Sequence, residues 1–302
     1  MTEFAEKLKE EAELYQVIYS RQLDNLESVL DGRRILVSGA GDSYAASLTG
    51  VALSGYEGET VDPRELSNYP KGSGITVIAV SLGGKTRSLV NSVSIHKHNG
   101  SKIIVVTGNL ESPLAKLGDK IVEVVHPSYI LGSGFGSYVS MTAAIAGLLG
   151  VDEKPAYNSQ CRPKNITMAT PFFIGETWSY GVAYFAMLKA HEDLGWPSRS
   201  ERLEQFMHAT VFSLKDYETP VILYPRDKLP RKFLSVLMKK SNPLFLEDLI
   251  EPETGNTAGI LICTIQSITR LIAEYISKEG LKEPYYRMTR SEAEDLARTI
   301  YT

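Results

Sequence analysis

Two short runs of glycine and hydroxyl-bearing residues are the first places where this sequence could do chemistry. The runs Ser38-Gly39-Ala40-Gly41-Asp42-Ser43-Tyr44 and Val80-Ser81-Leu82-Gly83-Gly84-Lys85-Thr86 each follow a β-branched stretch and precede a helical pattern. Glycine lets backbone N–H groups approach an anion closely, and a helix start presents the positive end of its dipole. Ser43, Ser81 and Thr86 add hydroxyl donors. Together the runs predict an anion-binding site.

Two other interpretations of these runs have to be weighed. A dinucleotide site needs a third glycine and an acidic residue about 20 positions further on, which the first run lacks. Alternatively, the turns do no more than connect strands to helices, and either run alone is compatible with that. Two such loops in one parallel sheet would converge at the carboxyl ends of the strands, where ligands of doubly wound sheets bind. The pair therefore favours binding.

A carboxylate in the second half of the chain is the candidate for moving a proton. Glu192 lies three positions after Lys189 on a predicted helix over 178–194 and shares a face with Val182 and Phe185. Burial raises the pKa of a carboxyl group toward neutrality, which suits a group that carries a proton between neighbouring carbons. The alternative is an ordinary solvated ion pair at an exposed helix end.

His208 is the candidate for a second acid–base role. Glu204 stands four residues before it and could orient the imidazole or raise its pKa if the segment is helical. The alternative is a core or surface histidine without a catalytic role.

The remaining histidines and the cysteines argue against a metal. His96 and His98 sit two positions apart, a spacing that points their rings to different faces of a helix, so we expect a solvated helix end there. Cys161 and Cys263 are isolated and lack zinc-ligand spacing, and their isolation also argues against a disulfide framework. We expect no metal, no cofactor and reduced cysteines.

Both loops resemble the SIS domain found in the isomerase half of glucosamine-6-phosphate synthase and in bifunctional phosphoglucose/phosphomannose isomerases. The turn Thr107-Gly108-Asn109 before Ser112-Pro113-Leu114-Ala115 and the later Asp119 are part of the resemblance, which covers roughly residues 33–150. It continues through the second half, where the similar proteins carry a catalytic Glu and a His sixteen residues later, the spacing of Glu192 and His208.

The resemblance implies a role for each matching residue. Ser43, Ser81 and Thr86 would hold the phosphate and Asp42 would face the sugar. Glu192 would move a proton between C1 and C2, and His208 would open the sugar ring, often from the neighbouring subunit of a homodimer with shared active sites. The full set of predicted binding residues is Gly41, Asp42, Ser43, Ser81, Leu82, Gly83, Thr86, Ser137, Lys189 and Arg298.

Departures from the family pattern affect the expected site. Gly83 replaces a usual phosphate-binding serine, Leu82 replaces a polar neighbour, and Ala209-Thr210 replaces a Gly-Pro pair. Arg298 replaces a lysine near the end of the similar proteins, and because arginine stays protonated it is a poor imine-forming nucleophile. Ser137 is the expected sugar contact in the glycine-rich segment 131–137, which lacks the acidic and lysine residues of the relatives.

The elements that must position these residues alternate along the chain. Short apolar runs without polar alternation are typical of strands buried on both faces, and their alternation with helices indicates parallel βαβ units. These runs are Ile35–Val37, Thr76–Val80, Lys102–Val106, Lys120–Val125, Met168–Phe173, Val221–Tyr224 and Leu244–Leu246. Helices are expected near Trp178–Leu194, Lys232–Lys239 and Thr257–Lys278, besides a leading amphipathic helix or helix pair over 3–30.

The predicted fold class is α/β, with two tandem doubly wound parallel-sheet lobes of the flavodoxin-like SIS type. A leading helical segment over 1–32 and a C-terminal tail helix complete it, and the lobes cover 33–153 and 154–302.

Composition limits the partners and the compartment. Acidic residues outnumber basic ones, 36 to 32, and the chain has no Lys/Arg-rich run, which argues against nucleic acid. The charged start lacks the apolar core of a signal peptide, and the longest apolar stretch, Tyr138 to Val151, is too short to cross a bilayer. We expect a soluble cytoplasmic protein without a membrane partner.

These observations favour a sugar-phosphate aldose–ketose isomerase acting on a hexose or hexosamine 6-phosphate through an enediol. Two alternatives stay open. The first is an amino-sugar phosphate deaminase or deglycase of the same fold, and the second is a non-catalytic sugar-phosphate-binding regulator.

Overall fold

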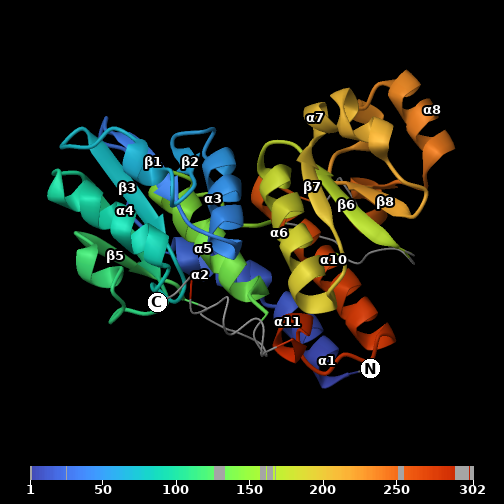
Figure 1. Ribbon diagram of the computed structural model, residues 1–302, viewed down its shortest axis with the longest axis horizontal. Coiled ribbons are helices and arrows are strands. Elements are labelled where there is room, and N and C mark those ends of the chain that lie inside the picture. Colours follow the sequence, from blue (N-terminus) through green and yellow to red (C-terminus); the bar gives the residue numbers. More distant parts are fainter. Residues whose placement is uncertain are drawn as a thin grey trace. The chain divides into compact units, whose positions relative to one another are not determined.

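The computed structural model describes residues 2–24, 26–125, 133–156, 161, 166, 168–250, 255–289 and 299. Two parallel sheets, one of five strands and one of four, organise the chain into two compact units (Figure 1). The five-stranded unit is built from Val17–Tyr129, Gly134–Glu153 and Thr289–Thr302. The four-stranded unit is built from Met1–Gln16, Ile130–Ser133 and Lys154–Met288. The expected α/β class with two tandem parallel sheets is confirmed.

Strands and helices alternate in the five-stranded unit. In chain order its elements are β1 (Arg34–Ser38), α3 (Asp42–Leu53), β2 (Glu59–Val61), η1 (Leu66–Asn68), β3 (Ile75–Val80), α4 (Arg87–His98), β4 (Lys102–Thr107), η2 (Ala115–Leu117), β5 (Lys120–Glu123) and α5 (Phe135–Leu148). The strand order is β2-β1-β3-β4-β5, and every neighbouring pair is parallel.

Each central strand is covered by helices on both faces. All six residues of β3 are buried, as the continuous apolar run predicts. A core cluster joins α4 to the sheet through Leu89 and Val93, which pack with Leu36, Val77 and Val105. Helices α3 and α5 pack against each other, and the Tyr138 hydroxyl lies 2.8 Å from the Thr49 hydroxyl between them.

The four-stranded unit repeats this strand order. Its elements are α1 (Glu3–Ala12), β6 (Thr170–Gly175), α6 (Trp178–Leu194), β7 (Arg199–Arg202), α7 (Leu203–His208), η3 (Thr210–Ser213), β8 (Glu218–Ile222), η4 (Arg226–Lys228), α8 (Arg231–Lys240), β9 (Leu244–Phe245), α9 (Leu246–Leu249), α10 (Thr257–Lys278) and α11 (Tyr285–Met288). Helix α2 (Tyr15–Leu23) crosses from this unit into the other. The sheet order β7-β6-β8-β9 corresponds, strand for strand, to β2-β1-β3-β4.

Two strands had no counterpart among the expected runs. β2 contains Glu-Thr-Val and β7 contains Arg-Ser-Glu-Arg, and both are edge strands. Their residues are mostly half-buried, so neither strand needs an apolar run. Each of the seven apolar runs overlaps a strand, although four of them extend one to two residues beyond it, and the leading helix pair is present as α1 and α2.

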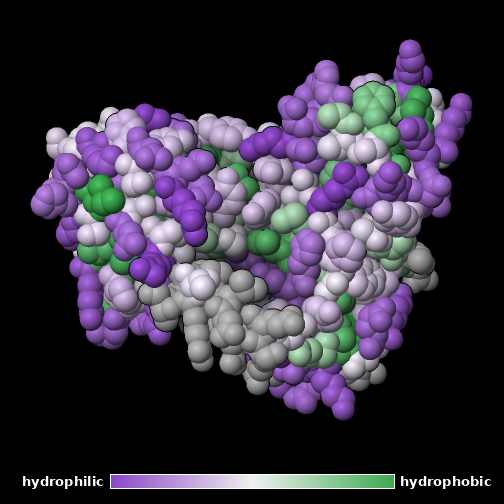
Figure 2. Space-filling model, viewed as in Figure 1, coloured by the Kyte–Doolittle hydropathy of each residue, from purple (hydrophilic) through white to green (hydrophobic). Residues whose placement is uncertain are grey.

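Helix α10 is long and apolar enough to cross a membrane by length and composition, but 83% of its apolar window is buried inside the protein. It packs against α1 and α6. The face of the molecule drawn in Figure 2 carries mostly hydrophilic side chains, with apolar ones in small separate patches. We therefore describe α10 as a core helix of the four-stranded unit.

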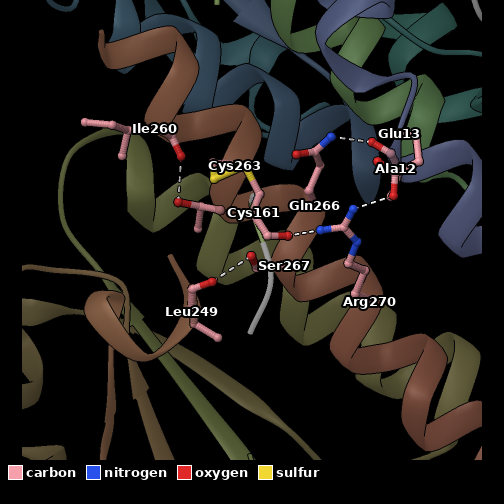
Figure 3. Close-up of a disulfide and its surroundings, with 10 residues drawn as sticks. Ala12, Glu13, Cys161, Leu249, Ile260, Cys263, Gln266, Ser267 and Arg270 are labelled. Atoms are coloured by element: carbon pink, nitrogen blue, oxygen red, sulfur yellow. Dashed lines mark hydrogen bonds and ion pairs between the residues drawn. A yellow bond between two sulfur atoms is a disulfide. The ribbon is translucent and has the colours of Figure 1, made fainter. Parts of the chain in front are cut away.

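The expectation of reduced, unpaired cysteines is wrong, because Cys161 and Cys263 form a disulfide that fixes a segment before β6 to α10 (Figure 3). The two residues are 102 positions apart in sequence, and spacing carries no information about a contact made by the tertiary fold. Arg270, two turns further along α10, donates to the Cys161 carbonyl and pairs with Glu13. The cysteines therefore provide no argument for a reducing compartment.

Candidate functional site

The two predicted loops lie side by side at the point where the strand order of the five-stranded sheet reverses. β1 pairs directly with β3, and Ser38 at the end of β1 lies opposite Ala79. The chain leaves β1 toward the edge strand β2 and leaves β3 toward β4, so the loops after β1 and β3 flank the topological switch point. Ligands of doubly wound sheets bind in the crevice outside the strand ends at this point. The prediction that the loops converge is confirmed.

The first loop depends on glycine at two positions. Gly41 has φ +58°, a conformation that other residues rarely adopt. A Cβ at Gly39 would lie 2.7 Å from the Ser43 Cβ, so a side chain there would force the loop away from α3. Ser43 is buried in the first turn of α3, and its hydroxyl donates to the Met141 sulfur at 3.4 Å.

The second loop brings two hydroxyls together. The oxygens of Ser81 and Thr86 lie 3.3 Å apart, and both side chains are nine-tenths or more buried. The Gly84 N–H donates to the Ser81 hydroxyl at 3.2 Å and to its carbonyl at 3.1 Å, which closes the loop as a tight turn. Thr86 is the N-cap residue of α4, without a side-chain cap bond. Its hydroxyl therefore sits where an anion meets the helix dipole.

The turn Thr107-Gly108-Asn109 braces this second loop. The Gly108 N–H and the Thr107 hydroxyl both donate to the Leu82 carbonyl, at 2.9 Å and 3.2 Å. Gly84 has φ +63°, and a Cβ there would come within 2.0 Å of the Ser112 hydroxyl. By contrast, a Cβ at Gly83 would meet nothing within 4 Å. Gly84 is fixed by packing, whereas Gly83 is exposed and leaves room for a side chain.

Asp42 lies against the beginning of α5 rather than in open space. A Cβ at Gly134 would lie 2.5 Å from an oxygen of the Asp42 carboxylate and 3.3 Å from the Ser137 hydroxyl. Ser137 is buried and donates to the Gly134 carbonyl at 2.9 Å. A carboxylate at a helix N-terminus is stabilised by the helix dipole. Asp42 and Ser137 are thus neighbours, and Asp42 is in a position to hold α5 against the first loop.

Lys189 and Glu192 form an ion pair near the end of α6. The Lys189 side chain is 1% exposed and that of Glu192 is 40% exposed, so the pair runs from the interior toward the surface. The Lys189 ammonium also lies 5.3 Å from the centre of the Phe185 ring. One turn further, Asp193 is fully buried and accepts a hydrogen bond from Ser133 at 2.7 Å. The expectation that both charged groups point inward holds for the lysine and in part for the glutamate.

Tyr15, in the same four-stranded unit, has a pKa that is set mainly by its burial. Burial raises the pKa of Tyr15 well above its usual value, and the nearby carboxylates of Glu11 and Asp193 raise it further. The Tyr15 hydroxyl lies 3.2 Å from that of Thr269. Tyr15 therefore stays protonated and acts as a hydrogen-bonding group.

His208 is the last residue of α7, and its Nε2 lies 2.8 Å from the Glu204 carboxylate. The predicted helical spacing of this pair is confirmed. The imidazole is 72% exposed, so a group outside this chain's own core can reach it. Arg298 lies outside the described residues.

Sequence reasoning was wrong about one histidine and missed two arginines. His96 is fully buried, not solvated, with Nε2 2.8 Å from the Leu66 carbonyl and Nδ1 3.3 Å from the Ser101 hydroxyl. Arg64 and Arg87 line a cavity next to Thr86. The sequence feature that could have drawn attention to Arg87 is its place at the start of a helix that has no acidic residue in its first turn.

The family model of the SIS domain matches residues 29–149, which include both loops. A protein of Archaeoglobus fulgidus is 38% identical over 99 residues, which are 30% of this chain and 51% of that protein. The glutamine–fructose-6-phosphate aminotransferase of Sulfurisphaera tokodaii is 27% identical over 132 residues, 43% of this chain and 22% of that enzyme. The chain thus matches about half of one relative and about a fifth of the other.

Solved structures cover nearly the whole chain. A Clostridium difficile protein assigned as a phosphosugar isomerase has a TM-score of 0.70 at 19% identity and covers 93% of this chain and 94% of its own. Glucosamine-6-phosphate deaminase of Thermotoga maritima has a TM-score of 0.70 at 16% identity, with 92% and 95% covered. Tagatose-6-phosphate ketose/aldose isomerase of Escherichia coli has a TM-score of 0.66 at 13% identity, with 90% and 93% covered. At these identities the likeness establishes the fold.

Proposed function

We propose, from the premise that residues 29–149 form a SIS domain, that this chain binds a phosphorylated sugar and interconverts its aldose and ketose forms. The observation that carries the proposal is the pair of hydroxyls of Ser81 and Thr86, 3.3 Å apart beside the first loop at the switch point of the sheet. Hydroxyls, loop N–H groups and a helix N-terminus are complementary to a phosphate dianion. Ser43, Ser81 and Thr86 are the proposed phosphate ligands.

Glu192 is the proposed proton shuttle. Aldose–ketose interconversion removes the proton from C2 of the open-chain aldose and delivers one to C1 through an enediol, and one carboxylate can serve both carbons. Glu192 is 40% exposed, so it can meet a substrate, and the buried Lys189 ammonium orients its carboxylate. Gly41, Asp42, Leu82, Gly83, Ser137 and Arg298 are proposed as further contacts around the sugar phosphate.

His208 is the proposed ring-opening group. Protonation of the ring oxygen requires a proton donor, and the Glu204 carboxylate 2.8 Å from Nε2 orients the His208 imidazole. Because the imidazole is largely exposed, a second copy of the chain could receive it, and we propose a homodimer with shared active sites. Sedimentation of the purified chain tests this: a fully active monomer would exclude the shared site.

Release of ammonia from an amino-sugar phosphate is the second candidate function. It uses the same carboxylate and the same enediol-type chemistry, and a glucosamine-6-phosphate deaminase is among the proteins of similar fold. A non-catalytic regulator would need the phosphate loops without proton transfer.

One set of assays separates the three functions. Hexose and hexosamine 6-phosphates are incubated with the chain in deuterated water, and ketose formation, ammonia release and deuterium at C2 are measured. An isomerase forms ketose with deuterium exchange, a deaminase also releases ammonia, and a regulator binds without exchange. The proposed site would be contradicted if loss of the Ser81 and Thr86 hydroxyls left the affinity for every tested sugar phosphate unchanged.

A further inference from the structure

A cavity of about 630 Å³ adjoins the phosphate loops within the five-stranded unit. Its walls include Ala40 of the first loop and Thr86 of the second, and beyond them Arg64, Arg87, Ser88 and Asn91. The volume falls in the range of roughly 300–1,000 Å³ typical of small-molecule sites. The cavity therefore extends the proposed site toward the edge strand β2.

Two guanidinium groups dominate the charge of this cavity. Arg64 and Arg87 line it together with one carboxylate, Asp62, which accepts the Arg64 backbone N–H at 2.8 Å. Within the described part of the chain, neither guanidinium has an ion pair or hydrogen-bond partner. Arginine presents a planar fork of donors that matches a carboxylate or a phosphate.

Arg87 stands at an unfavourable position for a cation. It is the first residue of α4, where the helix dipole is positive, and the first turn contains no acidic side chain. A cation there costs stability that an anion in front of the helix would offset. Helix α4 has 12 residues, long enough for a full dipole effect at its N-terminus.

Buried hydrogen bonds tie the loop that carries Arg64 to helix α4, which carries Arg87. The loop that carries Arg64 is tied to α4 by the Ser92 hydroxyl, which donates to the Pro63 carbonyl at 2.7 Å. His96, one turn further along α4, contacts the Leu66 carbonyl at 2.8 Å. The Ser92 and His96 side chains are buried, so the backbone on this side of the cavity is anchored to the core, while the Arg64 and Arg87 side chains are exposed.

We infer that the substrate or ligand of this site carries a second anionic group, a carboxylate or a phosphate, which Arg64 and Arg87 bind next to the sugar phosphate. This inference rests on the proposed function, since the loops must hold the first phosphate. A sugar phosphate without a second anionic group would leave both guanidinium groups facing solvent. The chain therefore discriminates between singly and doubly anionic sugars.

Calorimetry with three probes tests the inference. Fructose 6-phosphate carries one anionic group, fructose 1,6-bisphosphate adds a phosphate, and 6-phosphogluconate adds a carboxylate. We expect the wild-type chain to bind one doubly anionic probe on the order of tenfold more tightly than fructose 6-phosphate. The preferred probe tells phosphate from carboxylate.

The discrimination ratio, the dissociation constant for fructose 6-phosphate divided by that for the preferred probe, is then measured in variants. Arg64→Ala and Arg87→Ala should each lower it several-fold, because each variant removes part of the roughly tenfold preference. Lys116→Ala, which removes an exposed cation outside the cavity, is the control and should leave it unchanged. No preference in the wild type, or a ratio that the arginine variants leave intact, overturns the inference.

Failure of the proposed function looks different. If Ser81→Ala and Thr86→Val do not weaken the binding of fructose 6-phosphate, the phosphate loops are wrongly assigned, whatever the discrimination ratio is. If those variants weaken the binding of fructose 6-phosphate but the arginine variants leave the discrimination ratio unchanged, the loops are correctly assigned and a second bound anion is excluded.

Discussion

The Ser81 and Thr86 hydroxyl oxygens lie 3.3 Å apart across a tight turn that the Gly84 N–H closes. Both groups are buried by the protein, and each can donate one hydrogen bond to an anion that replaces their mutual contact. The turn itself is held by hydrogen bonds from Thr107 and Gly108 to the Leu82 carbonyl. Hydrogen bonds within the protein therefore position the hydroxyl pair.

Loss of this pair should weaken phosphate binding. The double variant Ser81→Ala, Thr86→Val removes two donors, each worth about 1.5–3 kcal/mol to a charged group, so affinity for a sugar 6-phosphate should fall at least about 100-fold. Calorimetry measures the dissociation constant. Ser235→Ala removes an exposed hydroxyl of α8 and serves as control. Equal affinities for the double variant and wild type would refute the clamp.

The adjacent glycines of the second loop, Gly83 and Gly84, should differ in how much their substitution changes stability. Gly84→Ala forces a Cβ into the Ser112 hydroxyl at φ +63°, so we expect a loss of roughly 1–3 kcal/mol in unfolding free energy. Gly83→Ser meets open space, should leave stability within about 0.5 kcal/mol, and adds a hydroxyl to the proposed phosphate loop. Urea denaturation and calorimetry measure the two effects. Similar stabilities for both variants would contradict the packing argument.

Glu192→Gln should separate catalysis from binding. The amide keeps the shape of the side chain and removes the base, so turnover should fall on the order of 10² to 10⁴ while sugar-phosphate affinity changes little. Glu279→Gln, an exposed carboxylate at the end of α10, is the control. His208→Ala should slow the reaction of the cyclic sugar more than that of an open-chain analogue. Unchanged turnover in Glu192→Gln would exclude it as the base.

Reduction of the disulfide should destabilise the four-stranded unit. The bond between Cys161 and Cys263 closes a loop of about 100 residues, and loss of such a constraint costs roughly 2–5 kcal/mol. Cys161→Ser, Cys263→Ser and wild-type chain with reductant should share a lowered midpoint in urea. The untreated wild type is the reference. A midpoint that reductant does not change would show that the bond contributes nothing to stability.

The buried His96 should make stability fall in mild acid. Burial lowers the pKa of its imidazole below the ordinary value of 6.5, so the unfolded chain binds the proton more readily than the folded one. Stability is therefore complete above about pH 6.5 and decreases as pH falls through and below that value. Denaturation midpoints from pH 5 to 8 should show this decrease in wild type, and His96→Gln should show less of it. Identical profiles would exclude His96 as the titrating group.

The sheet class and the position of the two glycine and hydroxyl loops could be predicted from the local sequence. Apolar runs such as Thr76–Val80 identify strands because a strand buried on both faces needs apolar residues at every position. The glycine and hydroxyl pattern after β1 and β3 is equally local, since a turn between a strand and a helix dictates its own residues. The pairing of Glu204 with His208 followed from helical spacing in the same way.

Contacts between distant residues were decided by the tertiary structure. The edge strands β2 and β7, the Cys161–Cys263 disulfide, the burial of His96 and the cavity around Arg64 and Arg87 all depend on segments that only the fold brings together. Local sequence cannot indicate them, because an edge strand needs no apolar run and a cysteine or arginine carries no sign of its partner. Packing settles which polar residues are buried, and burial decides what they can do.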